Sequence, residues 1–162
     1  MVIVKSIEET VAKLLVSNNL TISIAESLTG GMVSSELINY PGISSVFIEG
    51  CITYSNESKI NRLGVKKETL DKYGAVSKQT AREMALGIAK NFNTNIGLST
   101  TGIAGPNGAS KDKPVGLVYM GIYINGKTIV KKYEFKGNRQ EIRKQATKEL
   151  LNNLYIELIN KK

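Results

Sequence analysis

Short apolar runs alternate with amphipathic segments along this chain, and that alternation limits the fold more than any other feature. The runs at 20–25, 46–54 and 95–101 have the length and composition of buried strands, whereas the segments between them space apolar residues as helices do. Strands that alternate with helices are typical of α/β domains. The sequence therefore predicts a three-layer α/β/α sandwich, in one domain that spans residues 1–162.

One antiparallel hairpin is predicted near the carboxyl end of the chain. The strand-like runs LVYMGIYI at 117–124 and KTIVKKYEF at 127–135 flank the dipeptide Asn125-Gly126. Asn-Gly accepts the positive φ angles of a type I′ turn, which joins strands through two residues. The sheet is therefore expected to be mixed.

Residues that commonly cap helices mark where several helices should begin. Ser6, Ser77 and Asn138 each precede an amphipathic stretch, and Asn138 is followed three positions later by Glu141. Shorter helical pieces are expected between Gly31 and about Asn39, at 56–62 and at 66–73.

The absence of histidine restricts the chemistry of the chain more than any other fact of composition. With no His and one Cys, the sequence excludes Ser-His-Asp and Cys-His catalysis, histidine metal sites and a structural zinc site. Acid–base chemistry must then come from Lys, Tyr, Asp, Glu or water, and neither a metal nor a cofactor is expected. The single thiol, Cys51, has an apolar setting and is either a buried small residue or a reactive group.

The positive charge of the chain admits several kinds of partner. The net charge is +8, from 22 Lys and Arg against 14 Asp and Glu. The basic residues gather late in the chain without interleaved aromatic residues, which favours a solvated basic face or an anionic small-molecule site over a nucleic-acid groove. No apolar run reaches the roughly 18 residues of a membrane span, and the amino terminus does not resemble a signal peptide. A cytoplasmic location is expected.

The stretch IAESLTGG, at 24–31, joins the first strand-like run to a predicted helix. Such a turn exposes its middle residue and directs free helix N–H groups toward it, which makes Ser27 a candidate nucleophile beside an anion-binding backbone. Gly30 and Gly31 permit close approach of a ligand. The alternative is that Ser27 is an ordinary helix cap. A P-loop is excluded because the stretch lacks the Gly-Lys-Ser/Thr ending.

A serine hydroxyl needs a base, and without histidine a lysine with a lowered pKa is the natural candidate. The stretch TYSNESK places Tyr54 at a predicted strand end and Lys59 near a helix start. Tyr54 is a candidate to relay a proton or to hold the lysine in place. The alternative is that Tyr54 lies at the edge of the core and Lys59 is solvated.

Two later stretches have the composition of a ligand site. In STTGIAGPNG, Thr101, Gly102 and Gly105 follow a strand and offer space and backbone donors; the alternative is a plain turn. In GNRQEIRKQ, Arg139 and Arg143 share a helical face and are suited to grip a phosphate; the alternative is pairing with nearby acids or solvent.

These candidates share one position relative to the predicted sheet. Ser27, Tyr54 and Gly102 all lie at or just beyond the ends of predicted strands. Ligands of α/β sheets gather at the carboxyl ends of strands, so the three segments are expected to form one site.

Taken together, AESLTGG, TYSNESK, YGAVS, TGIAGPNG, KPVGLVY and GNRQEIRKQA resemble, in the same order, segments of the CinA C-terminal domain family. Stand-alone members of that family are nicotinamide-nucleotide amidases. The similarity runs from about residue 5 to residue 158, nearly the whole chain. Two departures from the family pattern are Leu28, where cysteine is common, and Asn138, where aspartate is usual. The side chain of Leu28 is expected to enter the core, and Asn138 keeps the helix cap.

The resemblance implies an α/β/α sandwich that hydrolyses the carboxamide of nicotinamide mononucleotide to nicotinate mononucleotide and ammonia, a reaction of NAD salvage, without a cofactor. It places the nucleophile at Ser27, the catalytic lysine at Lys59 and the active-site tyrosine at Tyr54. The nucleotide would lie between two segments, Thr29 to Gly31 and Thr101 to Pro106. Arg139 would contact its phosphate.

Two rival functions remain open at this point. One is a nucleotide-binding or regulatory module of the competence-damage family that has kept the pocket and lost catalysis. The other is a nucleic-acid accessory protein, suggested by the net charge of +8. Because small α/β enzymes are often symmetric dimers, a homo-oligomer, preferably a dimer, is also expected.

Overall fold

Five strands form one mixed sheet within residues 5–160, the part of the chain that the computed structural model describes. Residues 1–4 and 161–162, the ends of the predicted domain, lie outside this part. The strands are β1 (Ile22–Glu26), β2 (Phe47–Ile52), β3 (Ile96–Gly102), β4 (Leu117–Ile124) and β5 (Lys127–Glu134), in the order β2-β1-β3-β4-β5. The first three are parallel, and β4 is antiparallel to both β3 and β5. The predicted mixed sheet with one hairpin is confirmed.

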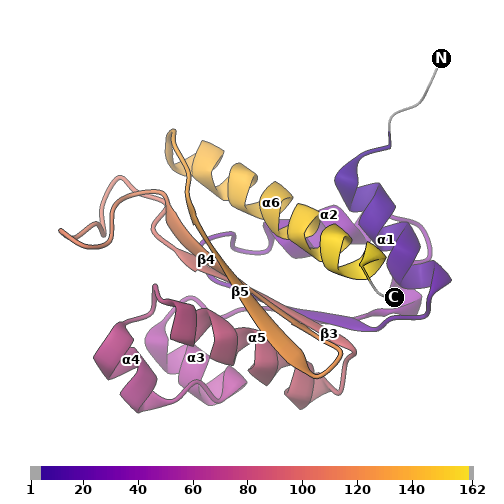
Figure 1. Cartoon of the computed structure of the whole chain (residues 1–162), viewed down its shortest axis with the longest axis horizontal. Helices are drawn as coiled ribbons and strands as arrows, with labels where there is room; N and C mark the ends of the chain where they lie inside the picture. Colours follow the sequence, from indigo (N-terminus) through magenta and orange to yellow (C-terminus); the bar gives the residue numbers. More distant parts are fainter. Residues whose placement is uncertain (1–4, 161–162) are drawn as a thin grey trace.

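Helices cover both faces of the sheet, as Figure 1 shows. One layer consists of α1 (Ile7–Ser17), α2 (Met32–Ile38) and α6 (Arg139–Ile159), which contact one another. The opposite layer consists of α3 (Asn56–Leu63), α4 (Lys67–Tyr73) and α5 (Lys78–Phe92), and α5 packs on the central strands. A short 3-10 turn, η1 (Ile43–Ser45), precedes β2. The three-layer α/β/α architecture is therefore as predicted.

The sequence signals at the helix ends act as expected. Ser77 accepts a hydrogen bond from the Thr80 amide at the start of α5. Asn138 and Glu141 form a reciprocal capping box at the start of α6. In the hairpin, Asn125 and Gly126 have φ angles of 53° and 75°, the left-handed pair that a type I′ turn requires.

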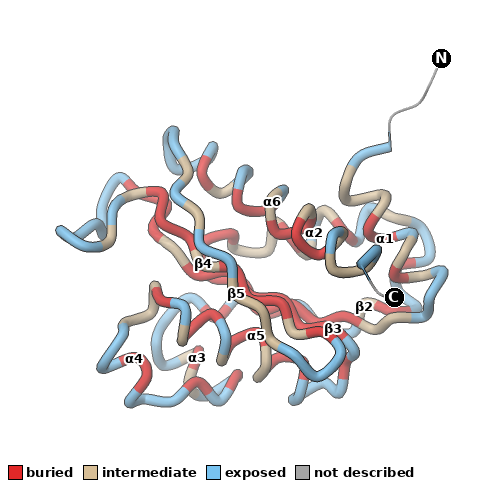
Figure 2. The backbone as a smooth tube through the Cα atoms, in the orientation of Figure 1, coloured by how far each residue is buried: buried red, intermediate tan, exposed pale blue. Residues whose placement is uncertain are grey.

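The apolar core lies on both sides of the central strands (Figure 2). All five residues of β1 are buried, and so are most of β3 and β4, whereas β5 at the edge of the sheet has no buried residue. Leu28 belongs to the core beneath α1, α2 and α6, as expected. Cys51 belongs to the smaller core beneath α3, α4 and α5, and burial raises the pKa of its thiol, which supports a packing role.

The carboxyl ends of β1, β2 and β3 lie at the same edge of the sheet. Ala25 pairs with Cys51 on one side and Ser99 on the other, so the three strands end nearly level. The segments that follow are the turn at 27–31, the short link at 53–55 and the loop at 103–116. The fold therefore brings together the three segments that carry the predicted site. Among the described residues, no helix combines the length and apolarity needed to cross a membrane.

Candidate active site

A cavity of about 280 Å³ opens at this edge of the sheet. Ser27, Tyr54, Lys59, Gly102 and Arg139 all line it, together with Leu28, Ala75, Val76, Thr101, Ile103, Ala104, Gly105, Asn107 and Gly108. These residues come from five separate stretches of sequence. No aspartate or glutamate is among them, so the ionic groups of the wall are those of Lys59 and Arg139.

Lys59 is the most unusual residue of the cavity because it is a buried lysine without an acidic partner. Its side chain lies in α3 and the residue is 1% exposed. Its Nζ donates hydrogen bonds to three oxygens: the Thr53 carbonyl at 2.8 Å, the Tyr54 carbonyl at 3.2 Å and Oγ of Ser27 at 3.2 Å. No ion pair of Lys59 occurs among the described residues. The interpretation of Lys59 as a solvated surface charge is therefore wrong.

Burial gives this amine the properties of a base. Desolvation disfavours the ammonium form and lowers the pKa of Lys59 to about 8. A neutral amine has two N–H groups and one lone pair, and the carbonyls of Thr53 and Tyr54 can only accept hydrogen bonds. When Lys59 is neutral, those carbonyls engage its two N–H groups. The lone pair is then left for the third neighbour, the Ser27 hydroxyl, which can donate a proton.

Ser27 lies in the turn after β1 and does not cap a helix. The N-cap residue of α2 is Gly31, four positions later, so the ordinary-cap interpretation of Ser27 is wrong. The Ser27 amide donates to the Thr100 carbonyl of β3 at 3.1 Å, which ties the turn to the neighbouring strand. The amide of Leu28, the next residue, has no hydrogen-bond partner within residues 5–160. An N–H group that could stabilise an oxyanion therefore lies directly after Ser27.

The buried carboxylate of Glu26 changes the expected role of the helix start. Glu26 is 1% exposed, and its two oxygens accept hydrogen bonds from the amides of Gly31, Val33 and Ser34 and from the Ser34 hydroxyl, at 2.8–3.1 Å. These are the amides that the sequence suggested for a substrate anion. The expected anion-binding backbone at the amino end of α2 is therefore not open to a ligand, because a carboxylate of the chain itself already occupies it.

The two arginines of α6 contact different segments. Arg139 donates to the Gly105 carbonyl at 2.8 Å and to the Tyr54 hydroxyl at 3.0 Å, and it lines the cavity. Arg143 donates from Nε to the Leu28 carbonyl at 2.8 Å and from a terminal nitrogen to the Thr29 carbonyl at 3.1 Å. The predicted phosphate contact of Arg143 is corrected: its guanidinium contacts the backbone of the turn at residues 27–31, and Arg143 does not line the cavity.

Tyr54 is positioned differently from the prediction. The residue is 60% exposed at the cavity wall, and its hydroxyl accepts a hydrogen bond from Arg139. Lys59 contacts the backbone carbonyl of Tyr54, and no hydrogen bond joins its amine to the phenol among the described residues. The expected phenol–amine pair is thus replaced by a carbonyl–amine contact, and the phenol lies at the rim with Arg139.

Comparison with known proteins identifies the family of this chain. The sequence model of the CinA C-terminal domain matches residues 4–158, almost the whole chain. The chain belongs to the CinA C-terminal domain family. A protein from Clostridioides difficile named as competence-damage inducible is 67% identical over 153 residues, which are 94% of this chain and 37% of that protein. One from Clostridium perfringens with the same name is 61% identical over the same shares. The chain thus spans about a third of the length of these curated relatives.

Solved structures of CinA proteins share the fold. A CinA superfamily protein from Klebsiella pneumoniae superposes with a TM-score of 0.91 at 29% identity, covering 94% of this chain and 96% of that one. A competence/damage inducible protein from Agrobacterium tumefaciens superposes with a TM-score of 0.88 at 37% identity, covering 99% and 100%. The family assignment and the fold made from sequence are both confirmed.

The remaining site residues predicted for this CinA-family chain separate into two groups. Thr101, Gly102 and Gly105 line the cavity, and the hydroxyl of Thr101 donates to the Ala75 carbonyl across it. The second group lies outside the cavity wall. The Thr29 hydroxyl bonds that of Thr100, the Gly30 amide donates to the Ser27 carbonyl, and the Gly31 amide donates to Glu26. Thr29, Gly30 and Gly31 therefore shape the turn. Their predicted contact with the nucleotide is corrected, because none of the three lines the cavity.

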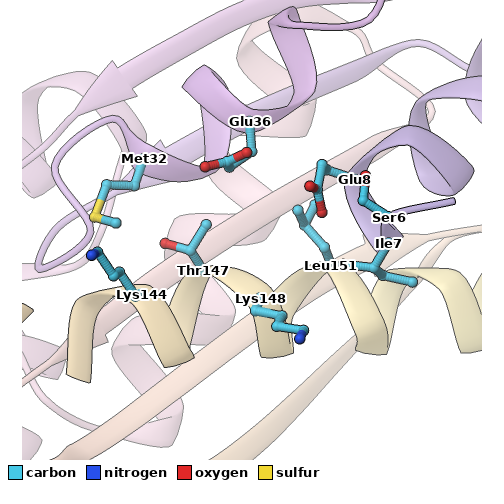
Figure 3. A pocket seen from close by; sticks show the side chains of 9 residues that line it. All are labelled: Ser6, Ile7, Glu8, Met32, Glu36, Lys144, Thr147, Lys148 and Leu151. Atoms are coloured by element: carbon cyan, nitrogen blue, oxygen red, sulfur yellow. The ribbon is translucent and has the colours of Figure 1, made fainter. Parts of the chain in front are cut away.

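A second cavity of about 280 Å³ lies between α1, α2 and α6 (Figure 3). Glu8 and Glu36 enter it from α1 and α2, and Lys144 and Lys148 belong to its α6 wall. None of the predicted site residues lines it, and it lacks a serine beside a buried amine. Within residues 5–160, no group of three or more His, Cys, Asp or Glu side chains is placed to hold a metal ion. The cavity at Ser27 is therefore the candidate active site.

Sequence reasoning missed two features of the site. Glu26 stood in the quoted motif, but its role was not predicted; the available signal was a carboxylate at the end of an otherwise apolar strand, which must find donors when buried. Ala75, Val76, Asn107 and Gly108 stand in the quoted segments YGAVS and TGIAGPNG, but the chemistry of these side chains did not predict that they line the cavity.

Proposed function

We propose that this chain hydrolyses the carboxamide of nicotinamide mononucleotide, with Ser27 as nucleophile and Lys59 as base. The observation that carries the proposal is the contact of 3.2 Å between Nζ of Lys59 and Oγ of Ser27, inside a cavity at the edge of the sheet. A buried amine whose pKa is about 8 is partly neutral at physiological pH and is fit to accept the serine proton. The substrate itself rests on the family resemblance.

The first half of the reaction forms an ester. Oγ of Ser27 attacks the carboxamide carbon as its proton passes to the amine of Lys59. The Leu28 N–H is placed to stabilise the oxyanion, a contribution of about 3 kcal/mol for such a donor. The C–N bond then breaks, and the leaving nitrogen takes the proton from Lys59 and departs as ammonia. The pyridinium ring withdraws electrons from the carbonyl and favours the attack.

The second half of the reaction restores the enzyme. Water attacks the ester carbon while Lys59 accepts a proton from it, and the serine oxygen leaves as the hydroxyl reforms. The product is nicotinate mononucleotide. The carbonyls of Thr53 and Tyr54 keep the lysine in place in both halves.

Arg139 is the candidate group for the phosphate. Two of its N–H groups contact Gly105 and Tyr54, and three others remain for a ligand at the cavity rim. A guanidinium is well suited to phosphate. The cavity wall carries no carboxylate that would repel the anion.

A coupled ammonia assay tests the proposal. Purified protein is given nicotinamide mononucleotide, or free nicotinamide as the comparison without ribose phosphate. We expect ammonia release from the mononucleotide and far less from nicotinamide. Binding of the mononucleotide without ammonia release would replace the proposal with the rival nucleotide-binding module.

A further inference from the structure

Two ionic side chains hold the nucleophile turn from opposite directions, and the reaction steps above use neither of them. Glu26 accepts hydrogen bonds from donors on the far side of the turn, at Gly31, Val33 and Ser34. Arg143 donates to the acceptors within it, the carbonyls of Leu28 and Thr29. The two sets of contacts are complementary, because the Glu26 carboxylate binds hydrogen-bond donors of the turn whereas the Arg143 guanidinium binds carbonyl acceptors.

The contacts of Glu26 close the chain into a ring around Ser27. Glu26 directly precedes the nucleophile, and its carboxylate bonds residues five to eight positions later. A carboxylate buried to this extent is stable only with such partners, and no ion pair involves it among the described residues. Four hydrogen bonds at 2.8–3.1 Å therefore fix where the chain leaves the strand and where α2 begins.

The contacts of Arg143 fix the peptide planes inside that ring. Its planar guanidinium reaches two successive carbonyls from α6, more than a hundred residues away in sequence. Gly30 is shaped to this contact, since its φ is +57° and an added Cβ would lie 3.1 Å from the arginine nitrogen. The Gly30 amide in turn donates to the Ser27 carbonyl at 3.1 Å.

Together, the contacts of Glu26 and Arg143 determine which backbone N–H groups of the turn remain without a hydrogen-bond partner. With the Ser27, Leu28 and Thr29 carbonyls engaged, and the amides of residues 30 and 31 engaged, the amides of Leu28 and Thr29 are the only backbone donors of the turn without a partner within residues 5–160. Because each N–H points opposite to the carbonyl of its own peptide group, fixing the carbonyls fixes these two donors. The turn is held with its free donors next to the nucleophile.

We propose that Glu26 and Arg143 are positioning residues, which hold the turn at residues 27–31 so that Oγ of Ser27 faces the amine of Lys59 and the free amide of Leu28, which lines the cavity, faces the oxyanion. This inference rests on the proposed function for its effect on turnover. Its effect on the reactivity of Ser27 can be measured separately, with a fluorophosphonate probe. In that reaction the Ser27 oxygen forms a bond to phosphorus, the P–F bond breaks, fluoride leaves and the serine proton passes to Lys59.

Two conservative variants test the contacts of Glu26 and Arg143 with the turn, and both variants keep Ser27 and Lys59. Arg143→Lys keeps the charge but loses the planar pair of donors, and Arg82→Lys on α5 is the matched control. Ser34→Ala removes one of the four bonds to Glu26, and Ser35→Ala, at an exposed neighbouring position, is its control. Circular dichroism at the assay temperature confirms that each variant is folded.

We expect each variant to react with the fluorophosphonate probe more slowly than wild type, while all of its molecules still become labelled in the end. We expect Arg143→Lys to label about 10-fold to 100-fold more slowly than wild type, as displacements of about 1 Å in an active site do, and Ser34→Ala to be slowed less. The kcat for nicotinamide mononucleotide should fall by the same factor with KM unchanged. A merely structural role would lower the fraction of protein that labels and leave the rate of that fraction unchanged, and this outcome would overturn the proposal.

The positioning proposal and the proposed function fail in different ways. Labelling of both variants at the wild-type rate would refute positioning and leave the amidase intact. Slow labelling of the variants, together with a wild type that labels quickly but releases no ammonia from the mononucleotide, would support positioning and refute the substrate. A wild type that neither labels nor releases ammonia would refute both.

Discussion

The dependence of activity on pH tests the role of Lys59 most quantitatively. Burial lowers the pKa of this amine to about 8, so about a tenth of the enzyme carries the neutral base at pH 7. A lysine with an ordinary pKa near 10.4 would be neutral in about 0.04% of molecules at that pH. The buried setting therefore supplies roughly 200 times more free base at pH 7. Below pH 8, kcat/KM should rise nearly tenfold per pH unit, and above pH 8 it should level off.

The assay is the initial rate of ammonia release at low substrate between pH 6.5 and pH 9.5. The phosphate of the substrate is largely dianionic over this range, because its second pKa is near ~6. Lys59→Arg provides the matched control, since a guanidinium stays protonated throughout and should be inactive at every pH. A flat profile, or a midpoint near the ordinary lysine value, would refute the neutral-amine mechanism.

Three further predictions concern stability and binding. The folded state favours the neutral form of Lys59, so the unfolded chain binds more protons and stability should rise with pH. The free energy of unfolding of wild type, taken relative to Lys59→Met in urea denaturation, should increase by about 2 kcal/mol from pH 7 to pH 9.5. An unchanged difference between the two proteins would contradict the lowered pKa. Arg139→Ala should raise KM about tenfold to a hundredfold with little change in kcat, and an unchanged KM would reject the phosphate contact. Gly87→Ala would press a Cβ against the Leu63 carbonyl of α3 and should cost about 1–3 kcal/mol in thermal or urea unfolding, whereas the exposed Lys90→Ala on the same helix should be nearly neutral.

Much of the fold could be predicted because local signals agree with one another. Asn125-Gly126 specifies its turn without help from the rest of the chain, and Ser77 and Asn138 mark helix starts through hydrogen bonds only two or three residues long. The gathering of Ser27, Tyr54 and Gly102 around one cavity followed from a topological rule, since parallel strands of one sheet end at the same edge. The pairing of Ser27 with Lys59 was implied by the family resemblance. Sequence pattern is sufficient for features of these two kinds.

The features of the site that could not be predicted from sequence depend on contacts between residues far apart in the chain, which only the fold determines. The amides at the start of α2 were suited to an anion, and only the fold decides that the anion is Glu26. Arg139 and Arg143 look alike in sequence, yet one contacts the cavity rim and the other the nucleophile turn, because α6 crosses both. The phenol of Tyr54 faces Arg139 for the same reason.

The central claim is that the hydroxyl of Ser27 is the group that attacks the amide. Ammonia release from nicotinamide mononucleotide by Ser27→Ala, measured beside wild type and Ser35→Ala with folding checked by circular dichroism, tests that claim most directly. We expect Ser27→Ala to fall to the uncatalysed background while Ser35→Ala keeps wild-type turnover. A folded Ser27→Ala protein that still releases ammonia at the wild-type rate would contradict the account.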